Sequence, residues 1–332
     1  MLQSLLMNRH IAGPHLLASV ALLAACNSPA VFDKPATEIS DAMTSAISNI
    51  VQRDTSGPHL GFDTYSYPGD AAMLAWRDES VPYEWVGYYL EAPCHKDNSW
   101  SGRRQKLEDM GWGVAVIYVG EQTWGGAAGR RVVRTRYVTK YVKQTIRKNG
   151  RRVVRRVARR VPVRILVEPR ARKGSTCNRH LVTADRGARD GDDAISRAEA
   201  EGFPHGSVIF LDIERMDMVP SAMREYYRAW TKRVLDDGRY RPGFYAHTWN
   251  ASLIHADASA VFLLDGHREA PPFWISGGSG FSNESKPEEV GHAFANVWQG
   301  VLDVARTYSG IKLPIDISVA RFSSPSARQN GE

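Results

Sequence analysis

Short apolar runs alternate with amphipathic segments along most of the chain from about residue 57 onward. Runs such as Trp85–Tyr89 and Val114–Tyr118 are rich in β-branched and aromatic residues, which is typical of buried strands. Segments such as 221–236 carry apolar residues at helical spacing. Strands that alternate with helices pair in parallel, because each helix returns the chain to the start of the next strand. The pattern therefore predicts an α/β fold.

About eight strands are expected, and four helices lie between them. The strands are Leu60–Asp63, Trp85–Tyr89, Val114–Tyr118, Ser207–Glu214, Pro242–Tyr245, Phe273–Ile275, Asn296–Trp298 and Pro314–Val319, and the helices are 71–78, 103–110, 191–201 and 221–236. Without residues 130–172 the span from 57 to 323 holds roughly 220 residues, which fits a (β/α)8 TIM-like barrel. A doubly wound open sheet is the alternative. No glycine-rich phosphate loop follows the first strand, and we expect neither a cofactor nor a metal.

The N-terminal 25 residues have the pattern of a signal peptide. Arg9 precedes an apolar run, 11–25, that is shorter than the ~20 residues a membrane helix needs. The run ends in Leu-Ala-Ala before Cys26, which resembles a bacterial lipobox. We therefore expect cleavage before Cys26, a lipid on its thiol and a place in the cell envelope, at the outer membrane in a Gram-negative cell. The alternative is an ordinary secretory signal followed by a chance cysteine.

The remaining boundaries follow from composition. Residues 26–56 are expected to form a tether, 57–323 the barrel, interrupted by the insertion 130–172, and 324–332 a tail. After Cys26, the chain has two more cysteines, Cys94 and Cys177. An even number in an exported protein favours a disulfide between them, and two unpaired thiols are the alternative.

Charge is distributed very unevenly. The 332 residues carry a net charge of +7 and are 43% hydrophobic, which excludes wholesale disorder. Residues 130–173 alone hold 18 Lys and Arg against one acid, Glu168, so the rest of the chain has a net charge of −10. An acidic body with one strongly basic segment is expected to contact polyanions through that segment alone.

The basic segment has the pattern of a β-hairpin. Two β-rich runs, Val132–Lys148 and Arg151–Val167, flank Asn149-Gly150, a pair that favours a two-residue hairpin turn. This turn places Ile146 opposite Val153, Val142 opposite Val157 and Val138 opposite Val161. It also places Lys143 opposite Arg156 and Lys140 opposite Arg159, pairs that repel each other unless an anion lies between them.

We expect this ribbon, roughly 50 Å long, to project near the catalytic rim and to bind an anionic polymer or membrane surface. Nucleic acid is the least favoured partner in an envelope compartment. A solvated arm and a strand-addition interface are the alternatives. The candidate polyanion-binding residues are Arg136, Lys140, Lys143, Arg156 and Arg159.

Acidic residues recur at the expected carboxyl ends of the strands, where barrel enzymes carry their chemistry. Asp212 and Glu214 are two apart on one strand and so share a face, and Asp63 and Asp316 lie on the first and last strands. Two carboxyls in one desolvated site do not ionise independently, so one is held protonated, as glycoside hydrolysis requires. Acids at strand ends also cap helices or pair with arginines, which is the alternative for each.

Aromatic residues fall at the same strand ends and suit stacking on sugar rings, although each one taken singly also fits the core. The candidate substrate-binding residues are Tyr65, Tyr118, Tyr245, Trp274 and Trp298.

Several motifs carry a resemblance to a known family. They are Gly61-Phe62-Asp63-Thr64-Tyr65, Trp85–Leu90, Gly111-Trp112 with Ile117–Gly120, Gly202–Gly206 leading to Leu211–Glu214, and Gly243-Phe244-Tyr245. Together they resemble a secreted bacterial family of glycoside-hydrolase-like barrels, once catalogued as a domain of unknown function. That family is similar in turn to the Chalaropsis-type lysozymes, which cleave peptidoglycan with an Asp-x-Glu strand end.

The resemblance implies a role for each carboxyl. Glu214 would be the general acid, Asp212 the charged stabiliser, and Asp63 and Asp316 supporting acids. The implied activity is muramidase-like hydrolysis of peptidoglycan or a related envelope glycan by a lipid-anchored protein. The alternative is a non-catalytic glycan-binding or scaffold protein whose basic hairpin holds an anionic polymer or surface.

Overall fold

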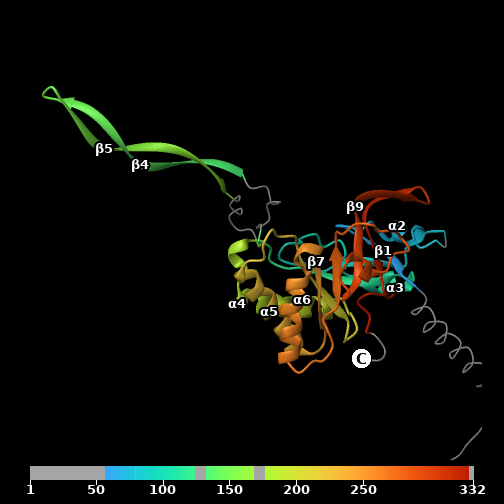
Figure 1. Ribbon diagram of the computed structural model, residues 1–332. Helices are drawn as coiled ribbons and strands as arrows, with labels where there is room; N and C mark the ends of the chain where they lie inside the picture. The colour runs from blue at the N-terminus through green and yellow to red at the C-terminus, as the bar shows by residue number, and fades with distance from the viewer. Residues whose placement is uncertain (1–56, 79, 124–131, 168–175, 329–332) are drawn as a thin grey trace, which may run out of the picture. The chain divides into compact units, whose positions relative to one another are not determined.

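The computed structural model describes residues 57–78, 80–123, 132–167 and 176–328 and contains the closed eight-stranded barrel that the sequence predicts (Figure 1). Most strands of the barrel are followed by a helix, as in an α/β barrel. The strands are β1 (His59–Asp63), β2 (Trp85–Tyr89), β3 (Gly113–Val119), β4 (Val132–Lys148), β5 (Arg151–Val167), β6 (Val208–Ile213), β7 (Arg241–His247), β8 (Phe273–Ser276), β9 (Ala295–Tyr308) and β10 (Ile311–Ala320). The helices are α2 (Asp70–Ala75), α3 (Arg104–Asp109), α4 (Ala184–Ala200), α5 (Ser221–Asp237) and α6 (Thr248–Leu264), with 3-10 turns η1 (Arg179–Leu181) and η2 (Pro287–Val290).

The order of strands around the barrel is β1-β10-β9-β8-β7-β6-β3-β2. All neighbours pair in parallel except β10, which is antiparallel to both β9 and β1. The expectation of a wholly parallel cylinder is therefore wrong for the last strand. β9 and β10 are joined by Ser309-Gly310, both at positive φ, and so short a turn leaves no room for a crossover helix.

Several elements differ from the prediction, among them α6, α4 and β9, which runs to Tyr308 instead of ending at Trp298. α6 was not predicted and follows β7 without a break, with Ile254, Ala258 and Phe262 among its buried residues. α4 begins at Ala184, several residues before the predicted start at 191, with Thr183 accepting a hydrogen bond from the backbone N–H of Arg186 as its N-cap. The helices α5 and α3 agree with the predicted ranges to within a residue.

Large aromatic side chains fill the inside of the barrel. The fully buried rings of Trp85 and Phe210 both meet Trp274 edge to face, at centroid distances of 5.4 and 5.9 Å. Gly61 lies against the Trp85 indole, and a Cβ there would come within 2.2 Å of the ring. The core therefore fills the lower barrel and leaves polar side chains to the carboxyl ends of the strands.

The amino-terminal end of the barrel is covered by the segment after β10. The hydroxyls of Ser324 and Ser326 accept hydrogen bonds from the backbone N–H groups of Val114 and Val116, and Val208 donates to the carbonyl of Ser326. Residues 324–327, which the sequence assigned to a tail, thus hydrogen bond to β3 and β6.

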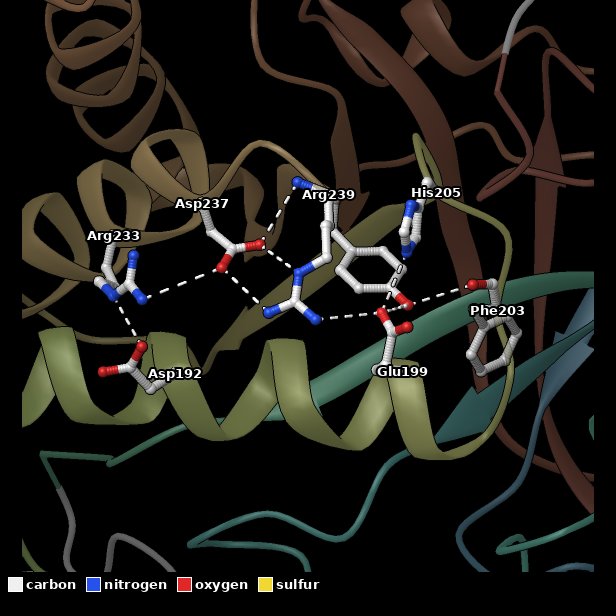
Figure 2. A network of polar contacts seen from close by, with 8 residues as sticks. Asp192, Glu199, Phe203, His205, Arg233, Asp237 and Arg239 are labelled. Atoms are coloured by element: carbon white, nitrogen blue, oxygen red, sulfur yellow. Dashed lines mark hydrogen bonds and ion pairs between the residues drawn. The ribbon is translucent and has the colours of Figure 1, made fainter.

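A network of ion pairs joins α4, α5 and the entry to β7 (Figure 2). Arg239 pairs with Asp237 at 2.8 Å and with Glu199 at 3.2 Å, and His205 lies 3.1 Å from Glu199. Arg233 contacts Asp192 at 2.6 Å. The groups are partly exposed, so each single pair contributes little to stability. Together they fix the helices at the end of the barrel away from the acidic strand ends.

β4 and β5 form a separate two-stranded sheet with the predicted register (Figure 1). Val142 pairs with Val157 and Lys143 with Arg156, and Asn149 and Gly150 both have positive φ, as the turn requires. The connecting segments 124–131 and 168–175 lie outside the described residues, so the placement of the hairpin near the rim stays a prediction. Residues 1–56, to which the sequence assigns the signal peptide, Cys26 and the tether, also lie outside the described residues, so these three features stay predictions. No helix among the described residues is long and apolar enough to cross a membrane.

The expected Cys94–Cys177 disulfide is present, with Cα atoms 4.6 Å apart and 83 residues apart in sequence. It ties the loop after β2 to the chain that follows the insertion. Thr176 donates to the carbonyl of Pro93 at 3.1 Å, and Asn178 donates its backbone N–H to Glu121 at 2.8 Å. The chain that follows the insertion is thus held to the barrel by one covalent bond and two hydrogen bonds.

Removal of this cross-link by Cys94→Ser together with Cys177→Ser is expected to lower the free energy of unfolding by about 3 kcal/mol, because the bond closes a long loop in the unfolded chain. Chemical denaturation measures the change. The Cys26→Ser variant is the matched control and should unfold as the unmodified protein does. Equal stability of all three proteins would contradict a structural role for the disulfide.

Candidate active site

The four carboxyls predicted from the sequence meet at one end of the barrel. Asp63 is the last residue of β1, and the antiparallel register places Asp316 of β10 directly opposite it. Asp212 lies near the end of β6, and Glu214 follows that strand. Each of the four interacts electrostatically with at least one of the others. Asp316 reaches this end because its strand is reversed, which brings a mid-strand residue level with the carboxyl end of β1.

Asp63 is buried and doubly hydrogen bonded. Its Oδ1 accepts a bond from the Tyr89 hydroxyl at 2.7 Å, and its Oδ2 accepts one from Gln299 Nε2 at 2.8 Å. The Gln299 Oε1 accepts a bond from the Tyr245 hydroxyl at 2.7 Å. Gln299 therefore links the first strand to β7 across the mouth of the barrel and fixes the orientation of the Asp63 carboxyl.

Asp316 owes its position to an irregularity in the β9–β10 pairing. The register shifts between Ile315 and Ile317, and Asp303 on the facing strand has a φ of 52°. The backbone N–H of Asp303 donates to Asp316 Oδ1 at 2.6 Å. A bulge of this kind re-aims a side chain, and here it fixes a carboxyl beside Asp63.

The Asp212–Glu214 strand end is held by a buried glutamine. Gln122, which follows Glu121 in the loop after β3, donates from Nε2 to the carbonyl of Asp212 at 2.8 Å and accepts from the backbone N–H of Glu214 at 3.2 Å. The Asp212 side chain itself is buried, and its Oδ1 has no hydrogen-bond partner. A buried oxygen without a donor favours the protonated carboxyl.

Burial and mutual repulsion raise the pKa values of the whole group. Burial, then the charge of Asp316, raises the pKa of Asp63 to about 7, although its two hydrogen bonds oppose the shift. Burial and the charges of Glu214 and Asp63 raise the pKa of Asp212 well above its usual range. Desolvation of its carboxyl and the charge of Asp316 raise the pKa of Glu214, although much of that residue is exposed. Burial raises the pKa of Asp316.

No Lys or Arg among the described residues forms an ion pair with any of the four carboxyls. Within the described part of the chain, these acids therefore do not serve as partners for internal arginines. The strong rise in the pKa of Asp212 does differ from the charged role that the family resemblance implies for it. In the protein alone, Asp212 is the carboxyl that burial most strongly keeps protonated.

The candidate aromatic residues divide by the face of the strand they occupy. Tyr245 is in register with Asp212 and with Trp274, so all three side chains point into the barrel. Trp274 is fully buried beneath Tyr245 and forms part of the floor. Tyr65 is 60% exposed, and its ring lies 4.5 Å from that of His95, which stacks on Tyr89.

Two of the candidates lie on the outside of the barrel. Tyr118 is fully buried and donates to Asp193 of α4 at 2.9 Å. Trp298 donates to the carbonyl of Gly277 at 2.6 Å and packs edge to face with Phe281. Both precede by one residue an inward-facing position of their strand, so the pleat directs them away from the carboxyls. Neither side chain is available to a substrate.

Three residues that hold the carboxyls were missed by sequence reasoning: Tyr89, Gln122 and Gln299. Tyr89 ends a predicted strand, at the end where the acids were expected, so its position could have identified it as part of the site. Gln122 and Gln299 lie beyond the predicted ends of their strands, and a single glutamine carries no pattern that identifies it.

The candidate polyanion-binding residues occupy both faces of the hairpin. Arg136, Lys140 and Arg159 share one face, and Lys143 and Arg156 share the other. The described side chains of β4 and β5 are mostly exposed.

The model of the family described as "Rv2525c-like, glycoside hydrolase-like domain" matches residues 75–320. A search of the curated proteins found no match.

Similar solved structures include an uncharacterized B. stearothermophilus protein, with 17% identity, a TM-score of 0.46 and coverage of 79% of this chain and 95% of that one. The Tat-secreted protein Rv2525c of Mycobacterium tuberculosis, in complex with L-tartrate, has 15% identity, a TM-score of 0.41 and coverage of 78% and 94%. A family GH25 lysozyme from Aspergillus fumigatus has 10% identity, a TM-score of 0.40 and coverage of 79% and 93%.

The family match includes β2, β6 and the whole of β10, and so spans three of the four carboxyls, Asp212, Glu214 and Asp316. It covers well over half of the chain. The chain therefore belongs to the Rv2525c-like family of glycoside hydrolase-like domains.

Proposed function

We propose that this protein is an exported glycoside hydrolase that cleaves peptidoglycan or a related cell-envelope glycan. The observation that supports it most is the group of four carboxyls, Asp63, Asp212, Glu214 and Asp316, at the carboxyl ends of the strands without a neutralising cation among the described residues. Such a group holds protons near neutral pH and also supplies anions, which are the two requirements of glycoside hydrolysis.

In this proposal Glu214 is the general acid. It is exposed and so accessible to a glycosidic oxygen, and its raised pKa favours the protonated form that a general acid needs. Asp212 lies beside it and stabilises the positive charge that develops at the anomeric carbon. That charge favours the ionised form of Asp212, so the substrate itself drives the pair toward one acid and one anion. Asp63 and Asp316 are supporting acids, oriented by Gln299 and by the backbone of Asp303.

We also propose export through residues 1–25 and lipid attachment at Cys26, with the barrel at 57–323 carried on the tether 26–56. The Cys94–Cys177 disulfide supports an oxidising compartment. The basic hairpin then holds the protein on an anionic polymer or membrane surface. Its directly opposed cations, Lys140 with Arg159 and Lys143 with Arg156, support an anionic partner.

A second candidate function is glycan binding without turnover. It is favoured by the buried, unpartnered Oδ1 of Asp212, because a protonated Asp212 does not stabilise a cationic transition state. Saturable glycan binding that survives Glu214→Gln, with no cleavage by either protein, would select this candidate.

Substitution Glu214→Gln tests the proposed acid. We expect the release of reducing ends from peptidoglycan to fall about 10²–10⁴-fold, because the amide has no proton to donate to the leaving oxygen. The matched control is Glu225→Gln on the exposed side of α5, which should leave the rate unchanged. Equal rates for both variants, with both folded, would remove Glu214 from the mechanism.

The pH dependence of stability tests the shared protons. The pKa of Asp63 is raised in the folded protein from 3.8 to about 7, so the stabilisation by its protonated form is complete below about pH 4 and is lost as the pH rises through about 7. Wild type should therefore lose up to about 4 kcal/mol between these limits relative to Asp63→Asn, as measured by urea unfolding at each pH. Glu225→Gln should follow the wild-type curve. Parallel curves for wild type and Asp63→Asn would show that Asp63 has an ordinary pKa.

Tyr65 tests the sugar-binding rim. Its ring is largely exposed and is supported from below by the ring of His95. We expect Tyr65→Ala to raise KM about 5- to 10-fold with kcat little changed, because it removes about 1 kcal/mol or more of stacking in the ground and transition states alike. Steady-state kinetics on soluble glycan fragments measure both constants. A fall in kcat at unchanged KM would place Tyr65 in the chemistry instead.

A further inference from the structure

The two faces of the β4–β5 hairpin differ in what covers their apolar side chains. One face, here called the aliphatic face, carries Val138, Val142, Ile146, Val153, Val157 and Val161. The other, here called the tyrosine face, carries Tyr137, Tyr141 and Val154 among threonines, arginines and Lys143.

On the tyrosine face, arginines of β5 lie over the rings of β4. The guanidinium of Arg156 is 5.8 Å from the centroid of Tyr141, and that of Arg160 is 5.5 Å from the centroid of Tyr137. Each ring therefore has a cationic partner within the hairpin, and Tyr137 and Tyr141 remain 57% and 66% exposed.

On the aliphatic face, apolar side chains lie opposite one another in cross-strand pairs. The pairs are Val138–Val161, Val142–Val157 and Ile146–Val153, and Val142 and Val153 remain 37% and 41% exposed. Among the described residues the hairpin pairs with no other strand. A two-stranded ribbon with one apolar layer is only marginally stable in water, so this face gains from a partner that covers it.

Cationic residues alternate with these apolar pairs. Lys140 with Arg159 and Lys148 with Arg151 form directly opposed pairs on the same face, and Arg155 lies between them. Successive layers on one face are about 7 Å apart. The aliphatic face thus presents apolar side chains and cations in regular alternation along its length.

Charge decides the class of partner. Thirteen of the 36 residues 132–167 are Lys or Arg and none is Asp or Glu, so a second copy of the hairpin is repelled. A soluble polyanion satisfies the cations and leaves the valines exposed. An anionic lipid surface satisfies both, because valines enter the headgroup boundary while the longer Lys and Arg side chains reach the phosphates.

We propose that the aliphatic face of the hairpin lies on a phosphate-bearing anionic lipid surface, with Val142 and Val157 at the headgroup boundary and Lys140 and Arg159 on the phosphates. This inference rests on the proposed function in that it specifies the anionic surface proposed there. It assigns the tyrosine face to the aqueous side.

The test uses the full chain with Cys26→Ser, so that no attached lipid contributes to binding. We measure binding to vesicles of phosphatidylglycerol and phosphatidylcholine, to vesicles of phosphatidylcholine alone, and to polyphosphate. The protein should prefer the anionic vesicles. The double variant Val142→Thr with Val157→Thr keeps β-branched residues, and should bind the anionic vesicles about tenfold more weakly through its loss of apolar burial.

The same variant should bind polyphosphate as before, because no charge is changed. The matched control, Thr139→Val with Thr145→Val on the tyrosine face, should leave vesicle binding unchanged. Lys140→Gln with Arg159→Gln should weaken binding to both probes. Undiminished vesicle binding by the Val142→Thr and Val157→Thr protein would overturn the proposal in favour of a soluble polyanion.

A face-specific label keeps the test independent of any effect on hairpin folding. Because Cys94 and Cys177 are bonded to each other, Val142→Cys or Thr145→Cys in the same background gives one free thiol for an environment-sensitive dye. The dye at 142 should become shielded from an aqueous quencher on anionic vesicles, and the dye at 145 should not. Equal shielding at both positions, or at neither, would contradict the orientation.

The outcome is separable from that of the catalytic proposal. Hydrolysis of soluble glycan fragments should not change in the hairpin variants, and Glu214→Gln should bind vesicles as wild type does. Failure of vesicle binding therefore leaves the glycan-cleaving site untouched, and failure of cleavage leaves the hairpin proposal untouched.

Discussion

The cost of burying like charges together is the constraint on which the proposed site depends. Barrel closure brings Asp63, Asp212 and Asp316 to one end, and among the described residues no cation is paired with them. Protons take the place of cations, which is why the pKa of Asp63 lies near neutrality. Hydrogen bonds from Tyr89 and Gln299 then fix the Asp63 carboxyl without neutralising it. The arrangement lowers stability at neutral pH and, in the proposed function, supplies carboxyls that exchange protons with a substrate.

Local periodicity made much of this predictable from the sequence. The two-residue spacing of Asp212 and Glu214 placed both beside the other acids, because side chains on a strand alternate between faces. The same rule gave every cross-strand pair of the hairpin once Asn149-Gly150 fixed the turn. The rule also explains the errors at Tyr118 and Trp298, which were chosen for nearness to a strand end. Their position relative to the inward-facing residues decides their direction, and both point outward.

The remaining features depend on contacts between distant parts of the chain. The reversal of β10 and the bulge that aims Asp316 follow from how β9 and β10 pair, and no local pattern at Asp316 encodes either. Gln299 acts by joining Asp63 to Tyr245, residues far from it in sequence. Gln122 likewise serves a strand end 90 residues away. Sequence reasoning therefore found the groups with distinctive chemistry and missed the amides that orient them.

The barrel mouth and the hairpin follow the same physical principle with opposite signs. Each concentrates like charges that its own described residues do not neutralise: carboxyls at the strand ends, and opposed Lys and Arg pairs along β4 and β5. Neither arrangement is the most stable one for an isolated protein, since a single substitution by a neutral residue relieves repulsion in either place. In the proposed function, a cationic transition state relieves the first repulsion and an anionic surface relieves the second. Because the carboxyls belong to the barrel strands and the opposed cations to β4 and β5, the proposed function assigns to each group its own partner of opposite charge.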